Sequence, residues 1–517
     1  MTDERPPLPV RPATAGALGG ALGAAGSIAC AELLAGVLPG IPSLLASIGR
    51  WVIDSQPPGA KDFVVSLFGT NDKLALELFI VLVAMAIGAL LGVISLRSHR
   101  VGSYGFLTFG AVGFVAALRD NQAVPTFTIV AAATATAVGI GIMSWLTGQG
   151  SEKPGPAVTA WSRPPSWSRR GFLIRSGSLA GGAFVAGGLG RLLLSGRGGL
   201  PVVAPIPAPG EVADLPDGAE LGLEGLTPIV VPNDQFYRID TALITPTVDI
   251  DAWTLKVTGM VDRPITLTYR ELVALPLIEQ FVTIACVSNE VGGDLVGNAK
   301  WTGVRLREVL GMAGVQAGAT QLMSRSVDDF TAGMPTAWIM DPGREPMVAV
   351  KMNDQLLPKD HGFPARLIIP GLYGYVSATK WLAELELTTM EAKDGYWIPL
   401  GWAKEAPILT QSRIDLPRRG SIPGGRQVIA GIAWAPDRGI SRVEVQIDGG
   451  DWNKATISTP ISKATWVQWK FDWEPARGEH KIMVRATDGT GKTQPMERTR
   501  PDPDGARGWH SRTVTVV

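Results

Sequence analysis

Five apolar runs before residue 195, each close to the ~20 residues that cross a bilayer as a helix, most strongly constrain how this chain can fold. They extend over residues 13–38, 74–96, 101–118, 124–146 and 172–194. A soluble helical core would show polar residues at helical spacing on one face, and the middle three runs show almost none. Residues 1–195 are therefore predicted to form an all-α transmembrane bundle of five helices within a lipid bilayer.

Basic residues between the runs predict the orientation of this bundle. They gather after the second run and after the fourth: Arg97, His99, Arg100, Lys153, Arg163, Arg169 and Arg170. Because basic loops stay in the cytoplasm, five crossings would carry everything after the last run to the extracytoplasmic side. One carboxylate, Glu32, lies near the end of the first run, where it is either functional or reaches toward the membrane surface.

The stretch "SRRGFLIRSG" stands just before the fifth run and resembles the twin-arginine export signal, with the motif at residues 168–174. Its paired arginines are followed by Phe172, Leu173 and a weakly apolar stretch rich in Gly and Ala. The alternative is that Arg169 and Arg170 are ordinary positive-inside anchors. The export interpretation implies a bacterial cell membrane and a domain that crosses it already folded, often with its cofactor inserted.

Composition excludes several classes of partner and site. Acidic and basic residues number 47 each, which argues against nucleic acid because phosphate binding needs a basic surface. Cys30 and Cys286 stand in segments of very different character, so neither a disulfide between them nor a four-thiolate metal site is expected. None of the four histidines lies within an apolar run, so we expect no bis-His haem in the bundle and no haem within this chain.

The rest of the chain divides by composition into a linker and two domains. Residues 196–226 are rich in Gly and Pro and lack periodicity, as is typical of a linker. Residues 227–405 mix short alternating runs with helical stretches such as "GVRLREVLGMAG", which predicts an α+β domain. Residues 406–517 alternate with a period of two, as at Val443, Val445 and Ile447, which predicts an all-β immunoglobulin-like sandwich.

One of the alternating runs, "FVTIAC", ends at Cys286, where a buried strand is expected to give way to a polar, glycine-rich and mobile loop. A lone buried cysteine commonly just fills space in a core. A single thiolate can also serve as a soft ligand for a redox metal. The residue types alone leave both interpretations open.

Three collinear blocks carry a family resemblance. They are "CVSNEVGG…AKWTGVRLREVL" at residues 286–310, "MVAVKMNDQLLPKDHGFPARLIIPGLYGYVSATKWLAELEL" at 347–387, and "PNDQFYRIDTAL" at 232–243. Together with "GWHSRTVTV" near the C-terminus, they resemble the sulfite oxidase family of molybdopterin-dependent oxidoreductases, here in a membrane-anchored bacterial form. The resemblance implies a molybdopterin-binding catalytic domain at 227–405, a dimerisation domain at 406–517 and a possible homodimer through the latter.

The same resemblance implies the residues of the site. Cys286 would be the protein's own ligand to molybdenum, and Arg238 would face the substrate. The residues expected to bind the molybdopterin cofactor are Asn233, Phe236, Tyr237, Arg238, Ile239, Asp240, Asp328, His361, Arg366, Ala378, Thr379 and Lys380. A soft thiolate suits a redox metal, and cationic side chains suit the phosphate of a pterin.

Two positions depart from the family pattern. Glu290 follows Asn289 where sulfite oxidases commonly have an arginine, which removes a positive charge from near an anionic substrate. Phe330 fills the place expected for the active-site tyrosine and cannot donate a hydrogen bond. These departures weaken sulfite as the substrate without excluding it.

The sequence thus predicts a membrane-anchored oxidoreductase that catalyses two-electron oxo transfer on a small sulfur-containing or related substrate outside the cytoplasm. Electrons would pass to a separate electron-transfer partner or directly to quinone. Two alternatives remain: a reductase of sulfoxide-type substrates, and a membrane-anchored binding module that has lost activity. A transporter with an appended domain is disfavoured, because charge within the apolar runs is scarce.

Overall fold

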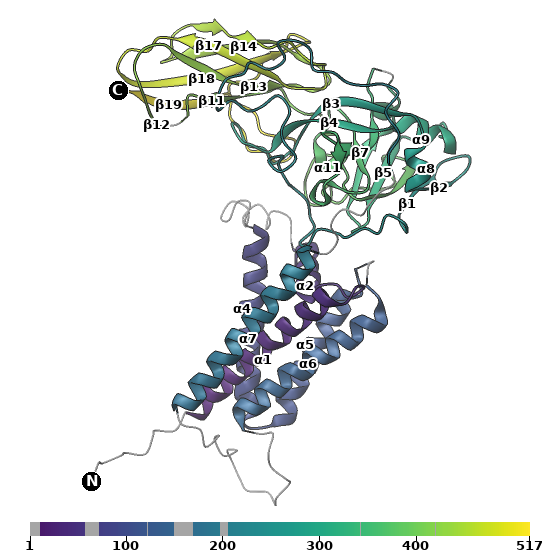
Figure 1. Cartoon of the computed structure of the whole chain (residues 1–517), viewed down its shortest axis with the longest axis vertical. Helices are drawn as coiled ribbons and strands as arrows, with labels where there is room; N and C mark the ends of the chain where they lie inside the picture. Colours follow the sequence, from purple (N-terminus) through teal and green to yellow (C-terminus); the bar gives the residue numbers. More distant parts are fainter. Residues whose placement is uncertain are drawn as a thin grey trace, which may run out of the picture. The chain divides into compact units, whose positions relative to one another are not determined.

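The computed structural model describes residues 11–56, 72–120, 123–148, 169–196, 205–341, 343–418 and 420–517. Internal contacts divide the chain into two compact units. The first comprises Met1–Gly199 with Ala242–Thr245, and the second comprises Leu200–Thr241 with Pro246–Val517. The described part of the first unit is built from helices, and the described strands belong to the second (Figure 1).

The first unit has a helix at each of the five predicted apolar runs, together with a short helix that was not predicted. Its helices are α1 (Pro12–Val37), α2 (Leu44–Ser55), α4 (Asp72–Ser95), α5 (His99–Ala117), α6 (Pro125–Thr147) and α7 (Arg169–Gly196). Within the described residues, α1, α4, α6 and α7 are long and apolar enough to cross a membrane. The arginine pair of the twin-arginine-like motif opens α7, whereas Ser168 of that motif lies outside the described residues.

Glycine allows α1 to approach its neighbours closely. A Cβ on Gly20 would lie 1.9 Å from the Gly88 carbonyl oxygen on α4. A Cβ on Gly36 would lie 2.6 Å from the Gly190 carbonyl oxygen on α7. Small residues at such crossings let two backbones approach closely. In lipid, where the hydrophobic effect does not drive helices together, this close packing is a main source of helix association.

The Glu32 side chain is held inside the helical unit. It is 2% exposed. Its carboxylate accepts hydrogen bonds from the Ser43 hydroxyl at 2.7 and 2.8 Å and from the Leu45 amide at 3.2 Å. Arg191 of α7 lies 3.7 Å from the same carboxylate and also contacts Glu77 of α4. The carboxylate therefore turns toward protein groups within α1, α2 and α7.

The part of the second unit that follows residue 253 begins with one mixed sheet, one antiparallel sheet and short helices. One sheet has the order β2-β1-β10-β5-β6 and the other the order β3-β4-β7-β8, with β9 paired to β7. Their strands are β1 (Thr254–Gly259), β2 (Ile265–Thr268), β3 (Leu277–Ala285), β4 (Val296–Arg305), β5 (Gln321–Ser326), β6 (Thr331–Pro335), β7 (Met347–Met352), β8 (Gln355–Leu356), β9 (Arg366–Ile368) and β10 (Leu382–Thr388). The helices are α8 (Tyr269–Val273), α9 (Leu306–Ala313), α10 (Thr336–Met340), η2 (Lys359–His361) and α11 (Gly374–Ser377). This is the predicted α+β architecture.

Local sequence explains several of these elements. Strand β3 is buried along most of its length, as its run of apolar residues predicts, and it pairs antiparallel with β4. Helix α8 begins with a capping box, in which the Thr268 hydroxyl and the Glu271 carboxylate each satisfy a backbone amide of the first turn. The helix predicted within residues 303–314 begins only at Leu306, because the preceding residues extend β4.

The C-terminal part consists of two further sheets around a separate core. Their orders are β11-β13-β17-β16 and β12-β19-β18-β14-β15. The strands are β11 (Gln411–Leu416), β12 (Gly420–Ile422), β13 (Gln427–Trp434), β14 (Ile440–Ile447), β15 (Trp452–Lys454), β16 (Thr456–Ile457), β17 (Val467–Trp473), β18 (Gly478–Asp488) and β19 (His510–Val516). Alternate residues such as Val443 and Val445 of β14 are buried, as the period of two predicts.

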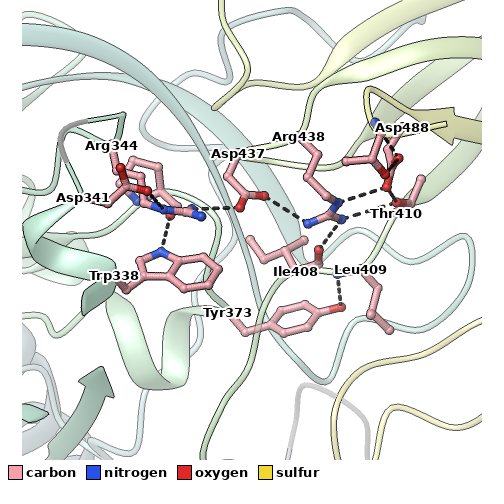
Figure 2. Close-up of polar contacts among 12 residues, drawn as sticks. Trp338, Asp341, Arg344, Tyr373, Ile408, Leu409, Thr410, Asp437, Arg438 and Asp488 are labelled. Carbon is pink, nitrogen blue, oxygen red and sulfur yellow. Dashed lines mark hydrogen bonds and ion pairs between the residues drawn. The ribbon is translucent and has the colours of Figure 1, made fainter. Parts of the chain in front are cut away.

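Ion pairs join the C-terminal sheets to the α+β part of the same unit (Figure 2). Arg344 lies 2.8 Å from a carboxylate oxygen of Asp437, and the other oxygen accepts from Arg438 at 3.0 Å. Arg438 also donates to Asp488 at 3.0 Å and to the Ile408 carbonyl at 2.8 Å. The two parts therefore meet through a connected polar network.

Candidate active site

Cys286 lies at the first position after β3, as the alternating run predicted. The cysteine is 9% exposed. Its amide donates to the Leu295 carbonyl at 2.9 Å, just before β4 begins, so the sulfur stands at the neck of the loop that joins two paired strands. A thiol in this place is fixed by a sheet rather than by a free loop.

The loop of residues 286–295 is internally bonded and partly buried, with Glu290 and Asp294 exposed, whereas the sequence suggested a mobile segment. The Asn289 side-chain oxygen accepts from the Leu295 amide at 2.9 Å, and the Asn289 amide donates to the Cys286 carbonyl at 3.1 Å. Asn289 is 2% exposed, and its side-chain nitrogen has no hydrogen-bond partner within the described residues. Asn289 was not among the predicted cofactor residues.

Aromatic rings bring the predicted pterin loop to this cysteine. Phe236 stacks on Tyr237 with ring centroids 5.3 Å apart, and its edge meets His361 at 5.6 Å. Both the Tyr237 hydroxyl and the Ala285 carbonyl oxygen lie next to Gly374. If Gly374 had a Cβ, that atom would be 3.9 Å from the hydroxyl and 3.5 Å from the carbonyl oxygen. Burial raises the pKa of Tyr237. The phenol therefore lies beside the end of the strand that carries the sulfur.

His361 is a buried, neutral imidazole. Its Nε2 lies 2.9 Å from the Asn233 carbonyl oxygen, and its Nδ1 has no partner within the described residues. Burial, and then the nearby Arg366 charge, lower the pKa of His361 to about 4. An anion at this place would oppose both effects and would favour the protonated imidazole.

Arg366 is a buried cation at the start of β9. It is 4% exposed, and its Nη1 donates to the His361 carbonyl at 3.3 Å. Its guanidinium lies 5.3 Å from the centre of the Trp301 ring, and Nε is without a partner in the described part of the chain. Burial lowers the pKa of Arg366 to about 10, which leaves it charged at neutral pH. Trp301 was not predicted as part of the site.

Lys380, Asp240 and Arg238 form a chain of ion pairs next to these residues. Lys380 Nζ and Arg238 Nε each lie 3.1 Å from the same oxygen of Asp240. Arg238 also pairs with Asp360 at 3.2 Å, a contact that the sequence did not indicate. Burial lowers the pKa of Lys380 to about 8, and Asp240 opposes that shift.

Four of the residues predicted to bind the cofactor lie in other surroundings than the buried cations. The Thr379 hydroxyl is hydrogen bonded to Ser324 at 2.7 Å, so it serves the fold of β5 rather than a pocket wall. Asp328 is bonded to Ser326 in the turn after β5, and Ile239 is 43% exposed. Ala378 is buried and lies 3.7 Å from the Cβ position of Gly374, next to the Tyr237 hydroxyl.

Tyr373 is a further buried side chain near the sulfur that sequence reasoning missed. It is 1% exposed, and its hydroxyl accepts from the Leu409 amide at 3.4 Å (Figure 2). Burial raises the pKa of Tyr373, and a negative charge on Cys286 adds to the rise. Only its position in the block at 347–387 could have drawn attention to it.

The donor set fits a phosphate-bearing pterin. Buried cations and unpartnered buried nitrogens are costly, roughly 1–3 kcal/mol for each unmade hydrogen bond, and an anionic acceptor would relieve that cost at Arg366 and His361. The described residues include no group of three or more His, Cys, Asp or Glu side chains that could hold a metal. A metal at Cys286 would therefore take its other ligands from a cofactor, as a dithiolene provides.

Two family models match the second unit. The oxidoreductase molybdopterin binding domain matches residues 242–397, and the Mo-co oxidoreductase dimerisation domain matches residues 411–501. Human mitochondrial sulfite oxidase is 30% identical over 316 residues, which cover 52% of this chain and 57% of that protein. These two domains place residues 242–501 of the chain in the sulfite oxidase family of molybdopterin oxidoreductases. Its cofactor is Mo-molybdopterin.

Two further proteins are similar to part of the chain. NADH nitrate reductase 1 of Oryza sativa is 30% identical over 314 residues, or 48% of this chain and 34% of that enzyme. The sulfane dehydrogenase SoxCD of Paracoccus pantotrophus has a TM-score of 0.48 and 24% identity over 56% of this chain and 81% of that one. The chain spans only about a third to just over half of the curated relatives it matches.

Proposed function

We propose that the chain is a membrane-anchored enzyme that carries out two-electron oxo transfer on a small sulfur-containing or related substrate on the extracytoplasmic side. The observation that carries the proposal is that one buried sulfur, Cys286, and one buried cation, Arg366, both lie close enough to the buried Tyr237 phenol to act on its pKa. A thiolate for the metal and cations for a pterin phosphate are the two requirements of this cofactor.

Each residue would have a distinct task. When bound, the molybdenum centre supplies the oxo-transfer and electron-transfer chemistry. Cys286 would bind the metal, while Arg366 and Lys380 would bind the phosphate side of the pterin. The Asn233 carbonyl, 2.9 Å from His361 Nε2, would orient the imidazole with its other nitrogen toward the cofactor. Phe236, 5% exposed, would exclude water from that contact.

Reduction of a neutral sulfoxide-type substrate is a second candidate, and the surroundings of Arg238 favour it. Arg238 is the cation expected to meet the substrate, but it lies within 3.2 Å of two carboxylates, Asp240 and Asp360. Glu290 and Phe330 replace groups that would attract and hydrogen-bond an oxyanion. When carboxylates offset the positive charge of Arg238, a neutral substrate loses less electrostatic binding energy than anionic sulfite does.

The test is a comparison of sulfite oxidation with sulfoxide reduction by the purified, molybdenum-loaded chain. We expect turnover in at least one direction and its loss in Cys286→Ser, because an alkoxide is a harder and more basic ligand than a thiolate. Activity in Cys286→Ser close to that of the parent would refute the ligand assignment. A loaded parent that turns over neither substrate class would favour the binding-module alternative.

Anchoring and assembly belong to the same proposal. The helices at the five predicted runs, of which α1, α4, α6 and α7 are the long apolar ones, would cross a bacterial cell membrane with the basic loops inside. Helix α7 (Arg169–Gly196) would begin with the arginine pair of a twin-arginine export signal. Residues 406–517 would form an immunoglobulin-like sandwich that dimerises, supported by the match to a dimerisation domain at 411–501. Electrons would pass to a separate partner or to quinone.

A further inference from the structure

The segment that bears Cys286 is hydrogen bonded to the C-terminal sheets on its N-terminal side. Thr283, three residues before the cysteine on β3, is fully buried. Its amide donates to the Ala464 carbonyl at 2.9 Å, and its hydroxyl accepts from the Trp466 amide at 2.8 Å. The strand that leads to the sulfur is thus fixed by residues from the far end of the chain.

Arg413 of β11 makes the corresponding contact on the C-terminal side. Its Nη1 donates to the Gly293 carbonyl at 2.9 Å, inside the loop that begins with Cys286. Its Nη2 donates to the Thr227 hydroxyl at 2.6 Å, and its Nε donates to Asp415 at 2.7 Å. The side chain is 11% exposed, so all three nitrogens are used in a largely dry setting.

The same loop rests on a second residue of the C-terminal sheets. Gly292 has a positive φ of 82°, and a Cβ there would lie 2.4 Å from Cδ2 of His510 on β19. His510 is itself fixed, because its Nδ1 accepts from the Ile414 amide at 2.9 Å. A loop in such close contact with a fixed ring has little freedom to move.

A short route connects Arg413 to the sulfur. The Gly293 carbonyl is two residues from Leu295, whose own carbonyl accepts from the Cys286 amide at 2.9 Å. The Leu295 amide is tied to Asn289 at 2.9 Å. A shift of Gly293 would therefore be passed to the backbone of the cysteine through a closed, hydrogen-bonded loop.

We propose that Arg413 is a positioning residue for the molybdenum site, through which the C-terminal sheets set the placement of the Cys286 thiolate. The inference rests on the proposed function of Cys286 as the metal ligand. Groups that hold a metal ligand in place commonly change activity by about 10–100-fold when they are removed. The C-terminal sheets would then contribute to the metal site as well as to dimerisation.

The test uses the molybdenum-loaded full chain with Arg413→Met, and Arg344→Met as a matched control. Arg344 is also a poorly exposed arginine that pairs across the same junction, at 2.8 Å from Asp437 (Figure 2). Its contacts with Asp341, Asp437 and Trp338 lie outside the cysteine loop. The readouts are the thiolate-to-metal charge-transfer absorption, the electron paramagnetic resonance of the one-electron-reduced protein, kcat/KM per molybdenum, and the melting temperature.

We expect Arg413→Met to shift both spectra and to lower kcat/KM by about 10–100-fold at equal molybdenum content. Arg413→Lys, which keeps a donor for the Gly293 carbonyl, should restore part of the parent spectrum and remain folded if the Met variant does not. Arg344→Met should lower stability without a spectral shift. Unchanged spectra in loaded Arg413→Met and Arg413→Lys would overturn the inference, whereas a parent without molybdenum would overturn the proposed function itself.

Discussion

Replacing Arg366 with Met should stabilise the cofactor-free protein but weaken its retention of the cofactor. Arg366 is 4% exposed, and burial lowers its pKa well below the ordinary value, to about 10. That shift corresponds to a cost of about 3 kcal/mol for holding the charge in the fold. Because the folded state binds this proton less tightly, the cost is fully present below pH 10 and disappears as the pH rises toward 12.5.

Methionine removes this cost together with one hydrogen bond, and its thioether can still pack against the Trp301 ring. The hydrogen bond from Nη1 to the His361 carbonyl, at 3.3 Å, would be lost and contributes roughly 2 kcal/mol as a charged bond. The net expectation is a cofactor-free protein that is more stable by about 1 kcal/mol, or about 2 °C in melting temperature. The loss of a charge-assisted contact to phosphate should weaken cofactor retention by about 10- to 100-fold.

The assay compares melting of the cofactor-free chain with molybdenum and pterin content after purification and dialysis. Arg307→Met is the control, because Arg307 is a 40% exposed partner of Glu345 on the same domain and should change neither quantity much. A cofactor-free Arg366→Met protein that is several kcal/mol less stable, or one that keeps full cofactor, would refute the reasoning.

Two further predictions concern export and pH. Changing Arg169 and Arg170 together to Lys keeps the charge but removes the guanidinium pair, so the second unit should become protected from protease on intact spheroplasts if a twin-arginine receptor reads it; digestion equal to the parent would favour an ordinary anchor. The cofactor-free chain should be fully stable above pH 6.5 and lose up to about 3 kcal/mol between pH 6.5 and 4, because burial holds the pKa of His361 at about 4. His361→Gln should flatten this part of the pH–melting profile, and an identical profile would contradict the assignment.

The elements that were predicted well depend on local pattern. The apolar runs form helices and the alternating segments form strands because side-chain periodicity decides which face is buried. Helix α2 (Leu44–Ser55) was missed because its 12 residues are too short to be recognised as a membrane span. The end of β3 at Cys286 was predicted because a glycine-rich loop follows it.

The contacts that complete the site depend on residues far apart in the chain. Arg413 meets Gly293 across 120 residues, and Trp466 meets Thr283 across 183. No periodicity marks such pairs, since they arise only when separate sheets pack together. The contacts that the cysteine loop makes were therefore not predicted. The partners that bury the loop come from the C-terminal strands.

The molybdenum and pterin content of the purified full chain tests the assignment of the cofactor most directly. Metal analysis and fluorescence of the oxidised pterin should each give one equivalent per chain, and Cys286→Ser should alter the thiolate-to-metal absorption. The cysteine is 9% exposed, and the same domain buries Arg366 Nε and His361 Nδ1 without a hydrogen-bond partner among the described residues, which such a cofactor would satisfy. A folded parent chain, produced in cells that make the cofactor, that contains neither molybdenum nor pterin would contradict the central claim.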